Sequence, residues 1–176
     1  MKRVLAVMAF AALAVPCLAS AAPLKKLKVN ETTTIKASPD KVWDTIKDFN
    51  AIDRWHPGIA KDEIVKGENN KPGAVRQLTI KDGPQLKEQL VAHNDAGRSY
   101  TYKIIDSPLP INHYMSTIKV TGRKDGTSLV RWSGTFTRKN TSDNPPEAEN
   151  DEAAVKLITG VYQGGLSNLK KMLEGG

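Results

Sequence analysis

Residues 151–173, with the sequence DEAAVKLITGVYQGGLSNLKKML, are the stretch that decides the fold of this chain. Apolar side chains recur there at helical spacing and form one face of a predicted helix that begins near Glu147 or Asp151. They are Val155, Ile158, Tyr162, Leu166, Leu169 and Leu173. A long helix with one apolar face must bury that face against a second layer. Three glycines inside it, at positions 160, 164 and 165, are expected to let the helix pass close to that layer or bend over a ligand.

The second layer is predicted from residues 59–138, where apolar and polar side chains alternate with a period of two. Turn-forming residues interrupt this segment at 69–73, 81–84, 94–97, 107–110 and 124–126. Six strands separated at such regular intervals indicate an antiparallel meander. Residues 27–35 alternate in the same way and contain three threonines, which favours one further strand.

Two short helices are predicted between that first strand and the meander. Ser38 suits the N-cap of the first helix, Pro39 suits its first position, and Trp43 is expected in the core. A second helical turn at 51–55 is ended by Pro57. The order predicts an α+β fold: a curved antiparallel sheet of about seven strands wraps round the long C-terminal helix and leaves a cavity beneath it.

The N-terminus has the three parts of a secretory signal peptide. Lys2 and Arg3 precede an apolar run at 4–15 that is too short to span a bilayer, and small residues at 19–22 provide a cleavage site. We therefore predict a signal peptide at 1–22, a single domain at 23–176 and a periplasmic location. Pro16 directly precedes the lone cysteine, Cys17, so neither a lipoprotein site nor a stable membrane anchor is expected.

The charge of the chain argues against a nucleic-acid partner. Without the predicted signal peptide, 24 basic residues face 19 acidic ones, a net charge of +5, and the two signs alternate along the chain. A local basic run at Lys25, Lys26 and Lys28 could contact an acidic protein partner or lipid headgroups, or it could simply be solvated. Removal of Cys17 with the signal also excludes disulfides and cysteine metal sites.

Strand periodicity places the even-numbered side chains between 74 and 136 on the inward face of the sheet. A hairpin turn centred near Asp82 would set Arg76 and Glu88 opposite each other, and a buried charge needs such a partner. Tyr102, Tyr114 and Trp132 share the same face. An apolar wall with a few convergent polar groups is typical of a small-molecule pocket. A structural ion pair within an ordinary core is the alternative, and periodicity does not decide between them.

Several motifs, taken together in order and spacing, resemble the polyketide cyclase/dehydrase-like branch of the SRPBCC superfamily, which includes START and birch-pollen-allergen domains. The motifs are Ser38-Pro39-Asp40-Lys41-Val42-Trp43, Asp48-Phe49, Trp55-His56-Pro57, Gly73-Ala74-Val75-Arg76, 86–90 with Glu88, Tyr100-Thr101-Tyr102, Ser107-Pro108-Leu109-Pro110, Tyr114, 130–136 with Trp132, and 161–170. Among its exported members the chain is most similar to the accessory proteins of bacterial methanol oxidation (MxaD-type). The resemblance implies a helix-grip fold with a cavity under the long helix, and places Trp55 and His56 near the cavity entrance.

The histidines do not form a catalytic or metal-binding motif. No partner that would orient His56 as a base is adjacent in sequence, and strand parity directs His93 and His113 outward. No nucleophile elbow and no glycine-rich phosphate loop follow a strand. We therefore expect no catalytic residues, no metal and no cofactor.

Three functional hypotheses follow from these features. The first is a non-catalytic binder of a small hydrophobic or amphipathic molecule, with Arg76, Glu88, Tyr102 and Tyr114 as polar anchors. Its apolar walls would be Trp55, Trp132 and Tyr162, with His56 at the rim. The second is a cyclase or dehydratase in which Arg76 polarises a carbonyl and Glu88 or His56 is the base. The third is an accessory protein that docks on a periplasmic dehydrogenase or cytochrome through its basic surface.

Overall fold

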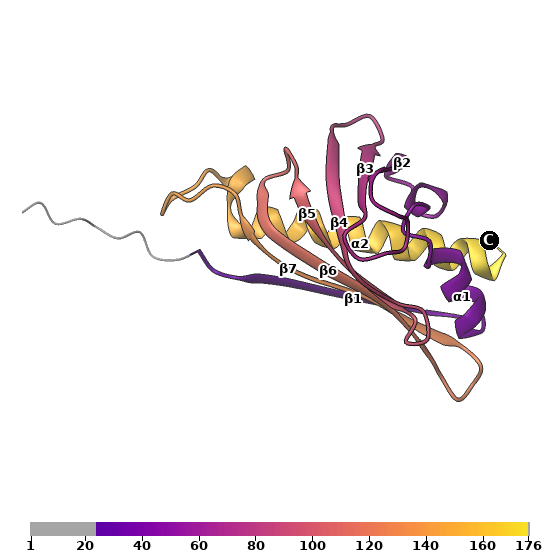
Figure 1. Cartoon of the computed structure of the whole chain (residues 1–176). Coiled ribbons are helices and arrows are strands. Elements are labelled where there is room, and N and C mark those ends of the chain that lie inside the picture. Colours follow the sequence, from indigo (N-terminus) through magenta and orange to yellow (C-terminus); the bar gives the residue numbers. More distant parts are fainter. Residues whose placement is uncertain (1–23, 176) are drawn as a thin grey trace, which may run out of the picture.

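A computed structural model describes residues 24–175, which form a seven-stranded antiparallel sheet curved around one long helix (Figure 1). The strands are β1 (Leu27–Ile35), β2 (Ile59–Lys66), β3 (Val75–Ile80), β4 (Gln85–Asn94), β5 (Ser99–Asp106), β6 (Ile111–Gly122) and β7 (Ser128–Arg138). The helices are α1 (Pro39–Ile46), the 3-10 turns η1 (Ile52–Arg54) and η2 (Glu147–Glu149), and α2 (Asp151–Glu174). The predicted fold class is confirmed. The predicted signal peptide lies outside the described residues.

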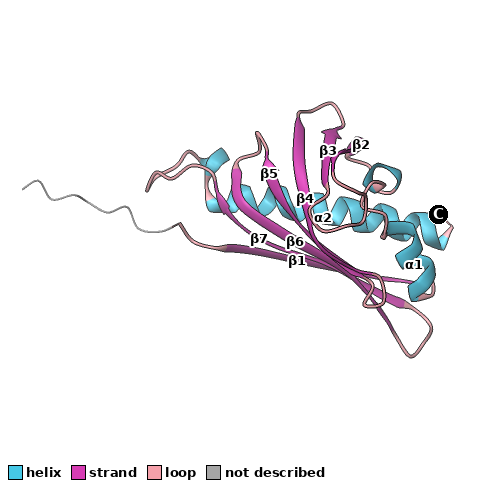
Figure 2. Ribbon diagram, viewed as in Figure 1, coloured by secondary structure: helices cyan, strands magenta, loops and turns pink. Residues whose placement is uncertain are grey.

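The sheet order is β1-β7-β6-β5-β4-β3-β2, and every neighbouring pair is antiparallel. Strands β2 to β7 therefore form the predicted meander, while β1 pairs with the last strand rather than with the next one. Because β1 and β2 are the two edge strands, the connection that carries α1 and η1 links opposite edges of the sheet (Figure 2). The residues of this connection can close one end of the curved sheet.

Both helices begin at the caps that their sequences provide. Ser38 accepts a hydrogen bond from the backbone N–H of Lys41 at 3.3 Å, and Pro39 occupies the first helical position. Asn150 caps α2 by accepting from the N–H of Ala153 at 2.8 Å. The helix ends at Gly175, whose φ of 78° is the left-handed conformation that favours glycine. The caps define where α2 starts and stops over the sheet.

Helix α2 packs its apolar face onto the concave side of the sheet. Its buried residues are Ala154, Ile158, Tyr162, Gly165, Leu166 and Leu169. Four of the six predicted core positions on the helix are therefore buried, whereas Val155 and Leu173 are only partly buried against the same core. Ala154, four positions before Ile158 on the same side of the helix, is buried in addition to the predicted positions.

The predicted inward parity holds along most of the sheet and fails beside register shifts in β4 and in β6, where Asn112 is exposed and Ile111 is buried. Even-numbered residues from Arg76 to Phe136 are mainly buried, but Ala92 is exposed. The register shifts between Leu90 and Ala92, so His93 pairs with Tyr100. A bulge inserts one residue and reverses the facing of the positions that follow.

The bulge corrects the prediction that His93 points outward. Its ring stacks parallel to that of Tyr100, with 6.2 Å between centroids, and lies 5.6 Å from that of Trp43. Its Nε2 lies 2.8 Å from the carbonyl oxygen of Lys47, where α1 ends. His93 therefore joins the sheet to α1. His113 is exposed, as predicted.

One of the three helix glycines is required by packing. A Cβ on Gly165 would lie 2.6 Å from Cδ2 of His56 and 2.8 Å from Cζ3 of Trp132, which is too close for any carbon atom. A Cβ on Gly160 or on Gly164 would meet no atom within 4 Å. Close approach of the helix thus depends on Gly165 alone, and the other two glycines play no part in it.

We predict opposite effects of alanine at two of these glycines. Gly165→Ala should lower the free energy of unfolding by roughly 1–3 kcal/mol, because the added methyl group overpacks the contact with His56 and Trp132. The control Gly160→Ala should raise it by up to about 1 kcal/mol through helix propensity. Urea unfolding followed by circular dichroism measures both. Equal effects of the two substitutions would contradict the close approach.

Candidate functional site

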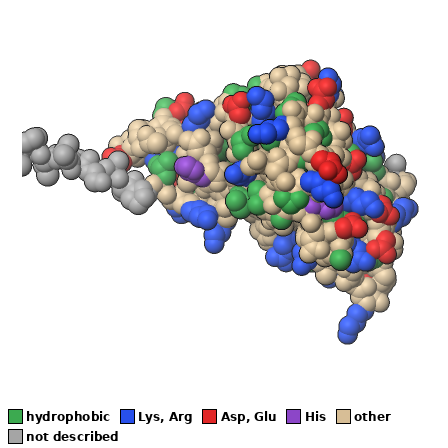
Figure 3. Space-filling view, in the orientation of Figure 1, with side chains coloured by type: hydrophobic (Ala, Val, Ile, Leu, Met, Phe, Trp, Pro, Cys, Tyr) green, Lys and Arg blue, Asp and Glu red, His purple; other side chains and the backbone are tan. Residues whose placement is uncertain are grey.

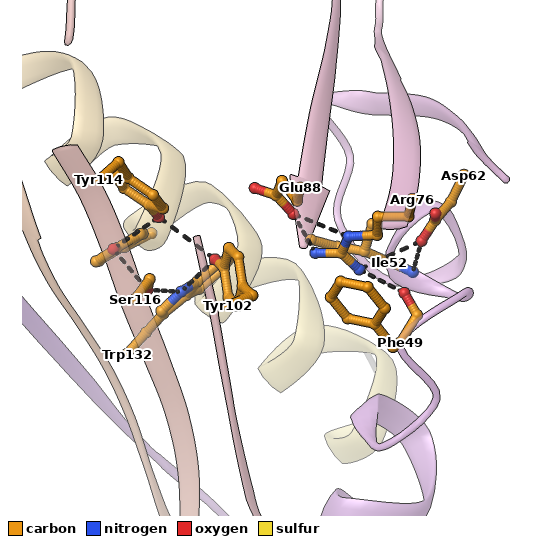
Figure 4. A network of polar contacts seen from close by, with 10 residues as sticks. Phe49, Ile52, Asp62, Arg76, Glu88, Tyr102, Tyr114, Ser116 and Trp132 are labelled. Atoms are coloured by element: carbon orange, nitrogen blue, oxygen red, sulfur yellow. Dashed lines mark hydrogen bonds and ion pairs between the residues drawn. The ribbon is translucent and has the colours of Figure 1, made fainter. Parts of the chain in front are cut away.

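A cavity of about 150 Å³ lies between the concave face of the sheet, the η1 segment and α2. Its lining is mostly apolar and comes from both ends of the chain. The lining residues are Ile52, His56, Gly58, Ile59, Leu78, Ile80, Leu86, Glu88, Tyr102, Ile104, Leu109, Tyr114, Trp132, Ile158 and Val161. The polar groups among them come chiefly from the two clusters described next, one on either side of the space (Figure 4).

The first cluster is built around Arg76, which is completely buried. Its Nε and Nη2 donate to one oxygen of Glu88, Oε2, at 2.8 and 2.6 Å. Its Nη1 donates to the carbonyl oxygen of Phe49 at 2.6 Å and to Oδ2 of Asp62 at 3.3 Å. The guanidinium also lies over the Phe49 ring, with Cζ 4.1 Å from the centroid. One cation thus connects β2, β3, β4 and the connection before η1.

Local sequence explains why these charges meet. Asp82 adopts a φ of 55° in the turn between β3 and β4, which sets the register that pairs Arg76 with Glu88. This confirms the predicted pairing. Asp62 is not among the predicted site residues. It lies on β2 opposite Leu78 of β3 and is diagonal to Arg76. Residues 61–66 of β2, KDEIVK, are too polar for periodicity to reveal which of their charges is buried.

The arginine is the dominant charge of the cluster. Burial by itself would lower the pKa of Arg76, but Glu88 and Asp62 outweigh this effect and raise it, so the cation is permanent. Burial raises the pKa of Glu88, and the adjacent guanidinium opposes the rise. Burial also raises the pKa of Asp62 to about 6, again against the attraction of Arg76. The two carboxylates share one cation, so the cluster carries excess negative charge when both are ionised.

The second cluster is a chain of hydroxyl groups around Trp132. The indole Nε1 donates to the hydroxyl of Tyr102 and to Oγ of Ser116, both at 3.0 Å. The Tyr162 hydroxyl lies 2.8 Å from both Ser116 Oγ and the Tyr114 hydroxyl, and the Tyr114 and Tyr102 hydroxyls are 3.3 Å apart. The rings of Trp132 and Tyr162 stack with centroids 4.5 Å apart.

The hydrogen-bond directions among these hydroxyl groups can be assigned in only one way. Each hydroxyl has one proton to donate, and that of Ser116 goes to the carbonyl oxygen of Ser133 at 3.0 Å. Tyr162 must therefore donate to Ser116, and Tyr114 to Tyr162. Tyr102 is left to donate to Tyr114, and at 3.3 Å this is the longest hydrogen bond between hydroxyl groups in the cluster.

Burial keeps these tyrosines neutral. It raises the pKa of Tyr162 to about 12, and it raises those of Tyr102 and Tyr114 well above their ordinary value. The hydroxyls therefore act as hydrogen-bond donors and acceptors. Gly134 makes the arrangement possible, because a Cβ there would overlap the Tyr162 hydroxyl.

Both ring nitrogens of His56 are occupied. Nδ1 accepts a hydrogen bond from the N–H of Gly58 at 3.1 Å, so the proton is on Nε2, which donates to the carbonyl oxygen of Val161 at 2.9 Å. Burial lowers the pKa of His56 and keeps the ring neutral. Asn168 adds a second link by donating to the carbonyl of Trp55 at 2.9 Å. His56 therefore fastens the η1 segment to α2, and neither nitrogen is free to take a proton from a ligand.

The eight predicted site residues divide into two groups. Five line the cavity: His56, Glu88, Tyr102, Tyr114 and Trp132. Arg76, Trp55 and Tyr162 lie outside the cavity lining and support residues that belong to it. Ligand binding at these positions stays a prediction. Strand parity had placed the aliphatic lining residues Leu78, Ile80, Leu86 and Ile104 on the inward face, but sequence reasoning did not select Ile52, Ile59, Val161 or Leu109.

Other kinds of site find no support within residues 24–175. No group of three or more His, Cys, Asp or Glu side chains is arranged to hold a metal ion. No helix in that part of the chain is long and apolar enough to cross a membrane. On the face shown in Figure 3, basic side chains are spread over several elements with acidic ones among them.

Comparisons with known proteins agree with this architecture. The profile of the family described as "Polyketide cyclase / dehydrase and lipid transport" matches residues 26–174. The solved structure of XoxI from Bacillus cereus is 37% identical, covers 83% of this chain and 94% of its own, and superposes with a TM-score of 0.72. An uncharacterised protein from Bacillus thuringiensis is 36% identical, with coverages of 84% and 98% and the same TM-score. MLP-like protein 423 of Arabidopsis thaliana is 29% identical over 128 residues, covering 68% of this chain and 81% of that protein.

The charge cluster predicts a large loss of stability when its cation is removed. Arg76→Ala strands Glu88 and Asp62 as buried charges and should lower the free energy of unfolding by about 3–5 kcal/mol. Arg98→Ala is the matched control, because Arg98 pairs with Asp40 at the exposed surface, and should cost less than about 1 kcal/mol. Chemical unfolding of both variants gives the comparison. A small effect of Arg76→Ala would refute the central place of this residue.

The raised pKa of Asp62 predicts that the difference in stability between the wild type and Asp62→Asn depends on pH. Because burial raises its pKa from 3.8 to about 6, the folded protein holds a proton between those values that the unfolded chain has lost. The contribution of Asp62 to stability therefore falls as pH rises from about 4 to about 6 and is constant above that.

Thermal melting of the two proteins from pH 4 to pH 7 tests this expectation. Asparagine keeps an oxygen for the N–H of Ile52 but does not ionise. The melting temperature of the variant should rise relative to wild type across the pH 4–6 window, while effects of His56 cancel because both proteins carry it. A difference that does not change with pH would contradict the raised pKa.

Proposed function

This chain belongs to the polyketide cyclase / dehydrase and lipid transport family, and on that basis we propose that it binds a small, largely apolar molecule beneath α2 without transforming it. One observation carries the proposal: a cavity of about 150 Å³ with an aliphatic and aromatic lining into which a few polar groups converge. A space of this size accommodates a single six-membered ring. A longer molecule would extend past the residues that close the cavity.

The arrangement of the polar groups supports binding over catalysis. Arg76 does not line the cavity and uses its nitrogens within the protein, so it is not placed to polarise a ligand carbonyl. Both ring nitrogens of His56 are engaged. Two of the three residues considered for the cyclase or dehydratase hypothesis therefore have structural tasks. A tight ion pair on one wall and a hydroxyl chain on the other form a rigid, preorganised site.

The location of the protein is part of the proposal. The signal-like residues 1–22 support export to the periplasm, and they also support the finer assignment to the exported accessory proteins of bacterial methanol oxidation. Fractionation of cells that express the full chain, with a matched form in which Lys2 and Arg3 are replaced by Glu, would test export. The wild-type chain should be cleaved and periplasmic, and the variant should stay uncleaved in the cytoplasm; cytoplasmic retention of the uncleaved wild-type chain would overturn this part.

A matched pair of tryptophan substitutions on β5 tests the binding site. Ile104 lines the cavity, whereas its neighbour Ile105 is 47% exposed. Ile104→Trp should fill the space and abolish binding of toluene, and Ile105→Trp should leave it unchanged. Ligand-observed NMR with toluene as the probe measures binding, and native mass spectrometry of the freshly purified protein reports any co-purified molecule. Equal binding of toluene by both variants, or failure of the wild type to bind any single-ring probe, would refute the site.

A further inference from the structure

Only one of the two carboxylate oxygens of Glu88 is hydrogen-bonded to Arg76. The guanidinium of Arg76 directs both Nε and Nη2 at Oε2, whereas an arginine fork often engages both oxygens of a carboxylate. Within residues 24–175, Oε1 has no hydrogen-bond partner, although the side chain is only 7% exposed. Figure 4 shows this second oxygen turned away from Arg76 and toward the side of the tyrosines. Glu88 therefore offers a charged acceptor to the cavity that it lines.

A hydroxyl donor lies on the same wall. Glu88 pairs with Ile104 and Leu90 with Tyr102, so Glu88 and Tyr102 are diagonal neighbours on one face of β4 and β5. Such neighbours are close enough for long side chains to share a partner. The proton of Tyr102 is the last in its chain, and 3.3 Å to Tyr114 is long for a hydroxyl–hydroxyl bond. An oxygen atom in the cavity can therefore compete for this proton.

From this geometry we infer that the cavity selects a neutral, single-ring molecule with a hydroxyl group, which donates to Glu88 Oε1 and accepts from Tyr102. The inference rests on the proposed binding function and specifies its ligand class. A hydroxyl is favoured because it is donor and acceptor at once. A carboxylate would be repelled by Glu88, and an ammonium group would lose its hydration among mostly apolar walls. A pure hydrocarbon would leave the carboxylate oxygen without a partner.

The test compares four molecules of similar size with different polar groups: phenol, toluene, benzonitrile and benzoate. Phenol can donate and accept, benzonitrile can only accept, toluene does neither, and benzoate is an anion. Wild-type protein should bind phenol at least about tenfold more tightly than toluene or benzonitrile, and benzoate least. Dissociation constants come from NMR titration at neutral pH, with Ile104→Trp to verify that binding is in the cavity.

Glu88→Gln should reverse the preference between donor and acceptor ligands. The amide oxygen will face Arg76, because a guanidinium has only donors, and the amide NH₂ will then face the cavity. Benzonitrile should bind this variant more tightly than phenol does. Glu63→Gln is the control, because Glu63 is an exposed partner of Lys61 on β2, and it should keep the wild-type order.

The outcomes separate the inference from the function on which it rests. If none of the four molecules binds, the proposed function fails. If toluene, benzonitrile and phenol bind wild type equally, or if Glu88→Gln keeps the preference for phenol, the function stands and the inference is overturned. If Glu88→Gln does not fold, the carboxyl ¹³C resonance of Glu88 in wild type decides instead: it should shift on addition of phenol and not of toluene, and equal responses would overturn the inference.

Discussion

The ion pair between Arg76 and Glu88, extended by Asp62 and the carbonyl of Phe49, is the constraint on which the rest of this structure depends. A fully buried cation has a very high free energy unless its donors are satisfied, so the segments that supply the acceptors are held around it. These segments are β2, β4 and the connection from α1, which are distant in the sequence. The end of the curved sheet is thus closed by a polar centre inside an apolar core.

That centre also gives the cavity its character. Because Arg76 engages one oxygen of Glu88, the pair presents a carboxylate oxygen to the interior while the cation stays behind it. Opposite, the hydroxyl chain from Tyr102 to Ser116 fixes its donors by mutual hydrogen bonds and by the stacking of Trp132 on Tyr162. Most donors and acceptors in both clusters are hydrogen-bonded to other residues of the protein. This keeps the clusters rigid and leaves few polar groups available to a ligand.

The helix that covers the cavity is attached to the polar end of the sheet rather than simply laid over it. His56 and Asn168 make hydrogen bonds between the η1 segment and α2, and Gly165 allows the helix to approach His56 and Trp132 closely. A histidine beside a cavity would ordinarily suggest acid–base chemistry. Here both ring nitrogens of His56 are hydrogen-bonded to backbone groups, so the residue holds the cavity wall in place.

The sequence by itself determined the element order, the register of the β3–β4 hairpin and most of the inward face, because strand alternation, helix periodicity, caps and turns are local properties. It could therefore predict that Arg76 and Glu88 face each other and that Tyr102, Tyr114 and Trp132 share their side of the sheet. Only the tertiary structure decided which of these residues line the cavity, that Asp62 joins the ion pair, and that His93 turns inward after a bulge. Those outcomes depend on contacts between β2, α2 and the α1 connection, and on one inserted residue, for which no local pattern carries a signal.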